Sequence, residues 1–105
     1  MAKRKMKIRT WRKGEGALVK AIVFHPMETG MRKNKTTGDN IPAHYIEQVV
    51  CELNGKTILT CLWGVSMSKN PFLSFNIKKV NKGDTLQLSW VDNQGNRDTA
   101  QAEIK

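Results

Sequence analysis

Apolar and polar residues alternate along most of this chain, and short turn-forming segments interrupt the alternation at regular intervals. The pattern is clearest in residues 72–80, 85–92 and 97–105, in each of which three apolar side chains alternate with polar ones. Successive side chains of a strand point to opposite faces, so each segment offers one face to a core and one to water. No segment combines helical spacing of apolar residues with caps at both ends. The pattern therefore predicts an all-β fold with little helix.

Four more segments are predicted to be strands, namely residues 6–10, 16–24, 44–53 and 56–63, and residues 16–24 indicate a more fully buried strand. The last three strands of the chain are separated by turns rich in Asn, Asp and Gly, and they are predicted to form a meander. About seven short strands with regular turns are typical of an immunoglobulin-like β-sandwich. A chain of 105 residues has room for one domain, so residues 1–105 are predicted to form a single sandwich.

An Asn-Gly dipeptide at positions 54 and 55 is a strong signal for a two-residue hairpin turn. A regular hairpin around this turn places Cys51 opposite Ile58 and Cys61 opposite Gln48. The two thiols then lie on opposite faces of the hairpin. Because a disulfide needs converging Cβ atoms, we expect two buried, unbridged cysteines.

The net charge of +9 makes nucleic acid a partner that has to be considered. Seven of the 18 basic residues lie within the first 13 positions, and residues 1–5 are expected to form a flexible basic segment. Phe75 and Trp90 fall on the apolar side of their strands, where they are not available to stack on bases. We therefore expect no nucleic-acid binding, although a basic nucleic-acid-binding sandwich stays open as an alternative.

Membrane insertion and secretion by a signal of its own are not expected either. The apolar runs are far shorter than the ~20 residues that cross a bilayer. The basic amino end is not followed by the apolar stretch and the cleavage site of a secretory signal.

Residues that could carry catalysis or bind a metal are sparse. His25, His44, Cys51 and Cys61 are the histidines and cysteines of the chain, and their spacing matches none of the common metal-binding motifs. No glycine-rich phosphate loop is present. The sequence predicts no catalytic residue, no cofactor and no metal, and it leaves open one alternative, a metal-dependent redox domain that uses His25 and His44.

Two connections between strands are unusual. Residues 25–42 form an 18-residue connection, and loops longer than ~12–15 residues are generally functional or disordered. A flexible loop without a function is the alternative interpretation. The second connection, residues 63–71, places apolar side chains in what should be a solvated turn. These side chains form a binding patch if they are exposed, or part of the core if they are not.

Six segments carry distinctive motifs, namely residues 24–32, 41–46, 53–56, 68–75, 82–84 and 90–95. Together these segments resemble the SoxZ family, the small subunit of the SoxYZ sulfur-carrier complex of bacterial thiosulfate oxidation. The resemblance extends in unbroken order from about residue 6 to residue 104. The motif of residues 24–32 and the Lys-Asn-Pro-Phe block of residues 69–72 are jointly rare, which makes the resemblance specific.

The resemblance implies a non-catalytic subunit that pairs with SoxY, whose carboxyl-terminal cysteine carries the covalent sulfur intermediates. This chain ends in Ala-Glu-Ile-Lys and has no such cysteine arm, so we do not expect the sulfur to be attached here. Other enzymes of thiosulfate oxidation are expected to contact the chain transiently through the complex. The family also implies a periplasmic location, reached by export of the folded chain together with a partner that has a signal.

Partner binding is predicted to involve the two unusual connections acting together. Aromatic residues, Met and Arg are enriched at the centres of protein interfaces, and both connections contain them. The predicted partner-binding residues are His25, Met27, Glu28, Met31, Arg32, Trp63, Val65, Met67, Asn70 and Phe72.

Overall fold

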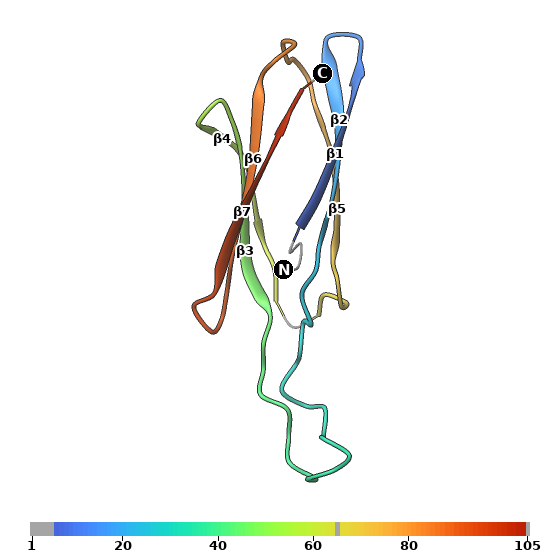
Figure 1. Cartoon of the computed structure of the whole chain (residues 1–105), viewed down its shortest axis with the longest axis vertical. Helices are drawn as coiled ribbons and strands as arrows, with labels where there is room; N and C mark the ends of the chain where they lie inside the picture. Colours follow the sequence, from blue (N-terminus) through green and yellow to red (C-terminus); the bar gives the residue numbers. More distant parts are fainter. Residues whose placement is uncertain (1–5, 65, 105) are drawn as a thin grey trace, which may run out of the picture.

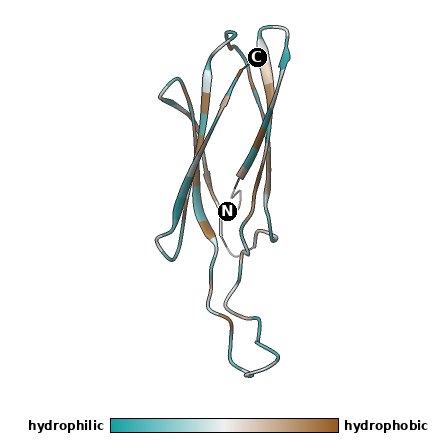
Figure 2. Ribbon diagram, in the orientation of Figure 1, coloured by the Kyte–Doolittle hydropathy of each residue, from teal (hydrophilic) through white to brown (hydrophobic). Residues whose placement is uncertain are grey.

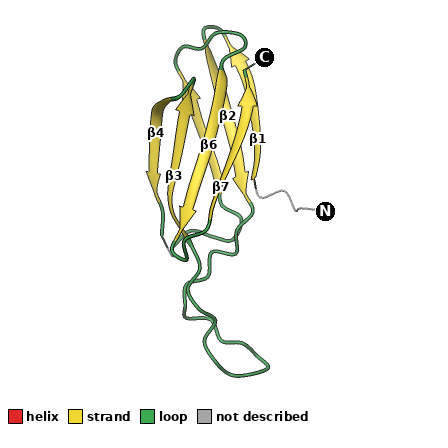
Figure 3. Ribbon diagram, turned by 60° about the vertical axis from the view of Figure 1, so that its left-hand side comes forward, coloured by secondary structure: helices red, strands yellow, loops and turns green. Residues whose placement is uncertain are grey.

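The computed structural model describes residues 6–64 and 66–104, which form two antiparallel sheets packed face to face (Figure 1). Within these residues the structure contains strands and loops and no helix (Figure 3). The strands are β1 (Met6–Lys13), β2 (Gly16–Val23), β3 (Ile46–Leu53), β4 (Lys56–Leu62), β5 (Phe72–Ile77), β6 (Thr85–Asp92) and β7 (Arg97–Glu103). The predicted all-β, immunoglobulin-like sandwich of about seven strands is confirmed.

The strands divide into a three-stranded sheet of order β1-β2-β5 and a four-stranded sheet of order β4-β3-β6-β7. β6 and β7 form the expected hairpin. The predicted meander of the last three strands is wrong, because β5 pairs with β2 in the other sheet. The turn between β5 and β6 therefore crosses from one sheet to the other. Alternation indicates which face of a strand is buried, but not which strand lies beside it.

The core lies between the two sheets and consists of the inward-facing residue of each alternating pair. Its fully buried members include Val19, Val23, Ile46, Val49, Leu86 and Leu88. A smaller cluster of Ala17, Val80 and Ile104 closes one end of the sandwich. The faces predicted from alternation in β5, β6 and β7 agree with this burial.

The hairpin of β3 and β4 contains an irregularity that changes the position of the cysteines. The register shifts between Cys51 and Glu52, so that Cys51 lies opposite Leu59 and Val49 lies opposite Cys61. Both thiols are thus on the core-facing side, and the prediction that they occupy opposite faces is wrong. Both are free cysteines in the structure. They are diagonal neighbours, about 7–8 Å apart by sheet geometry, which is too far for a disulfide.

The environment of the thiols predicts low reactivity in the folded protein. Burial raises the pKa of Cys51 to about 12, and it also raises the pKa of the half-buried Cys61. With a thiol reagent at pH 8, we expect Cys51 to react only on unfolding and Cys61 to react slowly, since the thiolate is the nucleophile. Denaturation without reductant should release two thiols per chain. A mass spectrum showing a bridge between the two cysteines would contradict this prediction.

Residues 25–42, which we call the arm, connect β2 to β3 and extend well beyond the end of the sandwich (Figure 1). Hydrophilic residues prevail along the arm (Figure 2), and all residues from 31 to 40 are exposed. The two branches of the arm are joined by a bridge between Lys33 and Asn40, and a second bridge links Glu28 to His44, which follows the arm. At its tip, the Gly38 amide donates to the Asn34 carbonyl at 2.8 Å. The long connection is therefore an extended, hydrogen-bonded arm.

Candidate functional site

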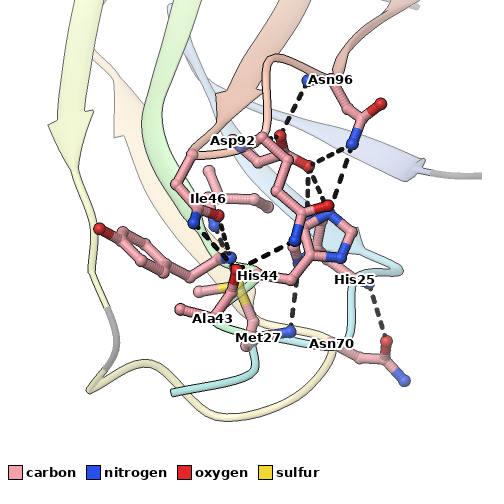
Figure 4. Close-up of polar contacts among 11 residues, drawn as sticks. His25, Met27, Ala43, His44, Ile46, Asn70, Asp92 and Asn96 are labelled. Atoms are coloured by element: carbon pink, nitrogen blue, oxygen red, sulfur yellow. Dashed lines mark hydrogen bonds and ion pairs between the residues drawn. The ribbon is translucent and has the colours of Figure 1, made fainter. Parts of the chain in front are cut away.

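A cluster of two histidines and one aspartate lies at the root of the arm (Figure 4). His25 follows the end of β2, His44 precedes β3, and Asp92 is the last residue of β6. The Nε2 atoms of His25 and His44 lie 3.1 Å and 2.7 Å from the same carboxylate oxygen, Oδ2 of Asp92. The side chain of Asp92 is fully buried, whereas His44 keeps 27% of its side chain exposed. Segments distant in sequence thus meet at one carboxylate.

Asp92 is held in the charged form by five hydrogen bonds. Besides the two histidines, the Asn96 side chain donates to Oδ2 at 3.2 Å, and the backbone amides of Gln94 and Asn96 donate to Oδ1 at 3.0 Å and 2.8 Å. Burial alone would raise the pKa of this carboxyl group. The hydrogen bonds from His25, Asn96 and His44 outweigh it and hold the pKa of Asp92 well below its usual range.

The hydrogen bonds of His25 determine where its proton lies. The backbone amide of Met27 donates to Nδ1 of His25 at 3.2 Å, so Nδ1 carries a lone pair. The proton of the neutral ring is then on Nε2, which donates to Asp92. Burial lowers the pKa of His25 despite the hydrogen bond to Asp92, so the ring is neutral at pH 7. Its edge also packs against Trp90, with the ring centroids 5.3 Å apart.

The cluster has the composition of a two-histidine, one-carboxylate metal site, and its three nearest donor atoms lie within 4.8 Å of one another. A metal-bound histidine offers a lone pair to the ion and donates its other N–H to a neighbour. His25 has the opposite arrangement, because its second nitrogen accepts a hydrogen bond from Met27. Binding through Nε2 would break that bond or require an anionic ring. In this geometry His25 is therefore not arranged to bind a metal through Nε2, and the hydrogen bonds of the cluster give the metal-dependent redox alternative no support.

The cluster instead attaches the arm to the sandwich and to the 63–71 link. The His25 amide donates to Oδ1 of Asn70 at 3.0 Å, and the Asn70 amide donates to the His25 carbonyl at 2.9 Å. On the other branch of the arm, the side chains of Asn93 and Gln94 both donate to the Ala43 carbonyl at 3.0 Å. The roots of the arm and of the link are thus held together, as Figure 4 shows for His25 and Asn70.

Several of the ten predicted partner-binding residues have little free surface. His25 and Met27 are buried, and the sulfur of Met27 accepts a hydrogen bond from the Ile46 amide at 3.4 Å. Trp63 and Met67 are half-buried and pack against the core, which places the apolar part of the link mostly in the interior. Glu28 and Asn70 are also half-buried. Val65 lies outside the described residues.

The exposed members of the predicted set lie in two separate places. Met31 and Arg32 are on the arm, where Met31 is 82% exposed and the Arg32 guanidinium pairs with the Glu28 carboxylate. Phe72 is 56% exposed, but it belongs to the outer face of the three-stranded sheet, where it lies beside Ile22. The structure therefore does not bring Phe72 together with the apolar side chains of the link. Contact of these residues with a partner stays a prediction.

Sequence reasoning missed two features of the surface and the site. Asp92 was not predicted to be a functional residue. An aspartate that begins a turn commonly accepts hydrogen bonds from the next backbone amides, and Asp92 does so. Trp11 was also missed. It is 43% exposed and lies in a strand rich in Lys and Arg.

The comparison with protein families is decisive for the identity of the chain. Residues 6–103 match the family described as sulphur oxidation protein SoxZ. The chain belongs to the SoxZ family. Membership in the SoxZ family assigns it a role in the sulfur oxidation system, as the resemblance implied. A search of curated proteins found no match.

Proposed function

We propose that this SoxZ-family chain is the non-catalytic subunit of a SoxYZ-type sulfur carrier. It binds a SoxY-like subunit, whose carboxyl-terminal cysteine carries covalent sulfur intermediates during thiosulfate oxidation. The observation that carries the proposal is the family match, which covers nearly the whole chain. Other enzymes of the system reach the chain transiently through the complex.

The chemistry of the candidate site supports a subunit without catalysis of its own. The Asp92 carboxylate accepts five hydrogen bonds and is buried, so it is poorly placed to take a proton from a substrate. Both cysteines face the core and have raised pKa values, which makes them weak nucleophiles. In this proposal the polar cluster positions the arm.

The arm supports partner binding. Its two branches are hydrogen-bonded to each other, and its root is anchored by the buried cluster, so docking would require little ordering of the backbone. Met31 and Arg32 provide the adaptable apolar contact and the charged contact that interface centres favour. A standard interface of ~1,600 Å² needs more surface than the arm tip alone. We therefore place neighbouring parts of the link in the same contact.

Binding to a co-purified SoxY-like subunit tests the proposal. We expect Arg32→Ala and Met31→Ala each to weaken the heterodimer by about 1 kcal/mol or more in titration calorimetry. Lys82→Ala, an exposed change in the turn before β6, is the matched control and should have almost no effect. Full affinity in an Arg32→Ala, Met31→Ala double variant would remove the arm from the interface. Failure of the unaltered chain to bind would overturn the proposed function itself.

We also propose a periplasmic location, reached by export of the folded chain with its partner. Cys51 is buried and Cys61 is half-buried, so both thiols are at least partly shielded from oxidation, which is compatible with an oxidising compartment. Cell fractionation should find the chain in the periplasm when the partner is co-produced. Equal periplasmic amounts without the partner would contradict joint export.

A further inference from the structure

The outer face of the three-stranded sheet combines positive charge with exposed aromatic side chains. The strand register places its outward residues in three cross-strand rows. These rows are Lys7 with Ile22 and Phe72, Arg9 with Lys20 and Ser74, and Trp11 with Leu18 and Asn76. Trp11 and Phe72 are 43% and 56% exposed, and Phe24, just beyond the end of β2, is 41% exposed. The face lies away from the core, whose side chains come from the alternate positions of the same strands.

Among the described residues, no acidic side chain forms an ion pair with the cations of this face, although Glu103 of β7 lines a neighbouring depression with Arg9 and Trp11. β1, β2 and β5 contain no Asp or Glu. Arg9 lies directly opposite Lys20, and like charges at such positions destabilise a sheet. In residues 6–64 and 66–104, the close contacts between basic and acidic side chains are those of Asp92 with His25 and His44 and that of Glu28 with Arg32. Anionic groups of another molecule would relieve the repulsion between Arg9 and Lys20.

The same face has a shallow apolar depression of about 240 Å³, lined by Trp11, Ile22, Phe72 and the cations Lys7, Arg9 and Lys20. An apolar floor with a cationic rim matches a protein surface in which carboxylates surround one or two large apolar side chains. We propose that this face is a docking surface for an acidic protein segment with apolar residues at its centre. The inference stands independently of the binding role of the arm.

Two other occupants are less compatible with the face. A second copy of this chain, with a net charge of +9, would bring the same cations together. Single-stranded nucleic acid needs open aromatic planes for its bases, but the Lys20 ammonium lies over the Trp11 ring, 5.8 Å from its centroid. The aliphatic side chains Leu18 and Ile22 also suit apolar protein side chains better than bases. The observations thus favour an acidic protein partner.

The test uses the full chain, labelled with ¹⁵N, and three probes. The first is a peptide that alternates Glu with Leu and Phe, the second is the same peptide with Gln in place of Glu, and the third is a thymidine oligonucleotide with the charge of the first. The Glu peptide should shift the indole signal of Trp11 and the amide signals of β1, β2 and β5. Its affinity should fall with added salt. The Gln peptide should bind at least tenfold more weakly.

Charge-reversal variants locate the binding. The double variant Arg9→Glu, Lys20→Glu should bind the Glu peptide at least tenfold more weakly than the unaltered chain. The control double variant Lys56→Glu, Lys82→Glu has the same change in net charge at other positions, and its affinity for the Glu peptide should fall less than twofold. The single variant Arg9→Glu turns the like-charge pair into an opposite-charge pair, so it should fold and still lose affinity. Three results would each overturn the inference. The two double variants could have equal affinity for the Glu peptide, the Gln peptide could bind as tightly as the Glu peptide, or the oligonucleotide could bind this face more tightly than the Glu peptide.

Discussion

Replacing Asp92 with alanine is expected to lower the free energy of unfolding by about 3 kcal/mol or more, since several buried donors each lose an acceptor at a cost of about 1–3 kcal/mol. The change removes a buried carboxylate that accepts hydrogen bonds from two histidines, two backbone amides and the Asn96 side chain. The donors of the buried His25 and of the turn would be left without an acceptor. Urea titration followed by fluorescence measures the loss. Asp39→Ala, on the exposed part of the arm, is the control and should change stability by less than about 0.5 kcal/mol.

Two further measurements identify the charge of Asp92 as the cause. The asparagine side chain of Asp92→Asn has the same shape as aspartate, but it cannot accept hydrogen bonds from all five donors. Most of the loss in the free energy of unfolding should therefore persist in this variant. The pKa of Asp92 is lower in the folded state than its ordinary value of 3.8, so its contribution is present above that value and is lost as the pH falls below it. The stability difference between the unaltered chain and Asp92→Ala should therefore narrow in acid. A difference below 1 kcal/mol at pH 7 would contradict the assigned role.

Gly16→Ala is expected to destabilise the protein by at least about 3 kcal/mol, the upper range for overpacking. A Cβ atom at this position would lie 2.2 Å from the Ile77 carbonyl oxygen and 2.9 Å from that of Lys78. Both contacts are with backbone, which cannot move without opening the pairing of β2 with β5. Thermal unfolding and the amide signals of these strands would show the effect.

Gly64→Ala is the matched control for this substitution. A Cβ at Gly64 meets nothing within 4 Å, and its backbone is not in the left-handed region. We expect a change of less than about 0.5 kcal/mol. If the two alanine variants were equally stable, the close approach of β2 and β5 at Gly16 would not exist in solution.

The strands were predictable because their signals are local. Residues 85–92 have the predicted bounds, since Leu86, Leu88 and Trp90 alternate with polar residues between two turns. The position of β5 was not predictable in this way, because its residues pair with residues of β2 that lie 50 to 60 positions earlier in the chain. The bulge beside Cys51 also has no turn residue to signal it, and it alone reversed the predicted face of Cys61.

The site was only partly predictable, because it also depends on contacts between segments that are distant in the sequence. His25 and His44 were recognised as the polar residues most capable of chemistry, but their common partner Asp92 is separated from them by 67 and 48 residues. The proton position on His25 depends on a backbone amide, which no side-chain pattern reveals. The aromatic residues weighed against nucleic-acid binding, Phe75 and Trp90, are indeed half-buried and buried. That reasoning left out Trp11.

The order of strands in the two sheets also affects how the chain acquires its structure. β1 and β7, the first and last strands, contact each other along one edge of the sandwich, and Ile104 after β7 is fully buried. The native packing therefore requires residues from both ends of the described chain. Folds dominated by such non-local pairing typically form in milliseconds to seconds, far more slowly than small helical bundles. During translation, this sandwich can close only after its last strand has left the ribosome.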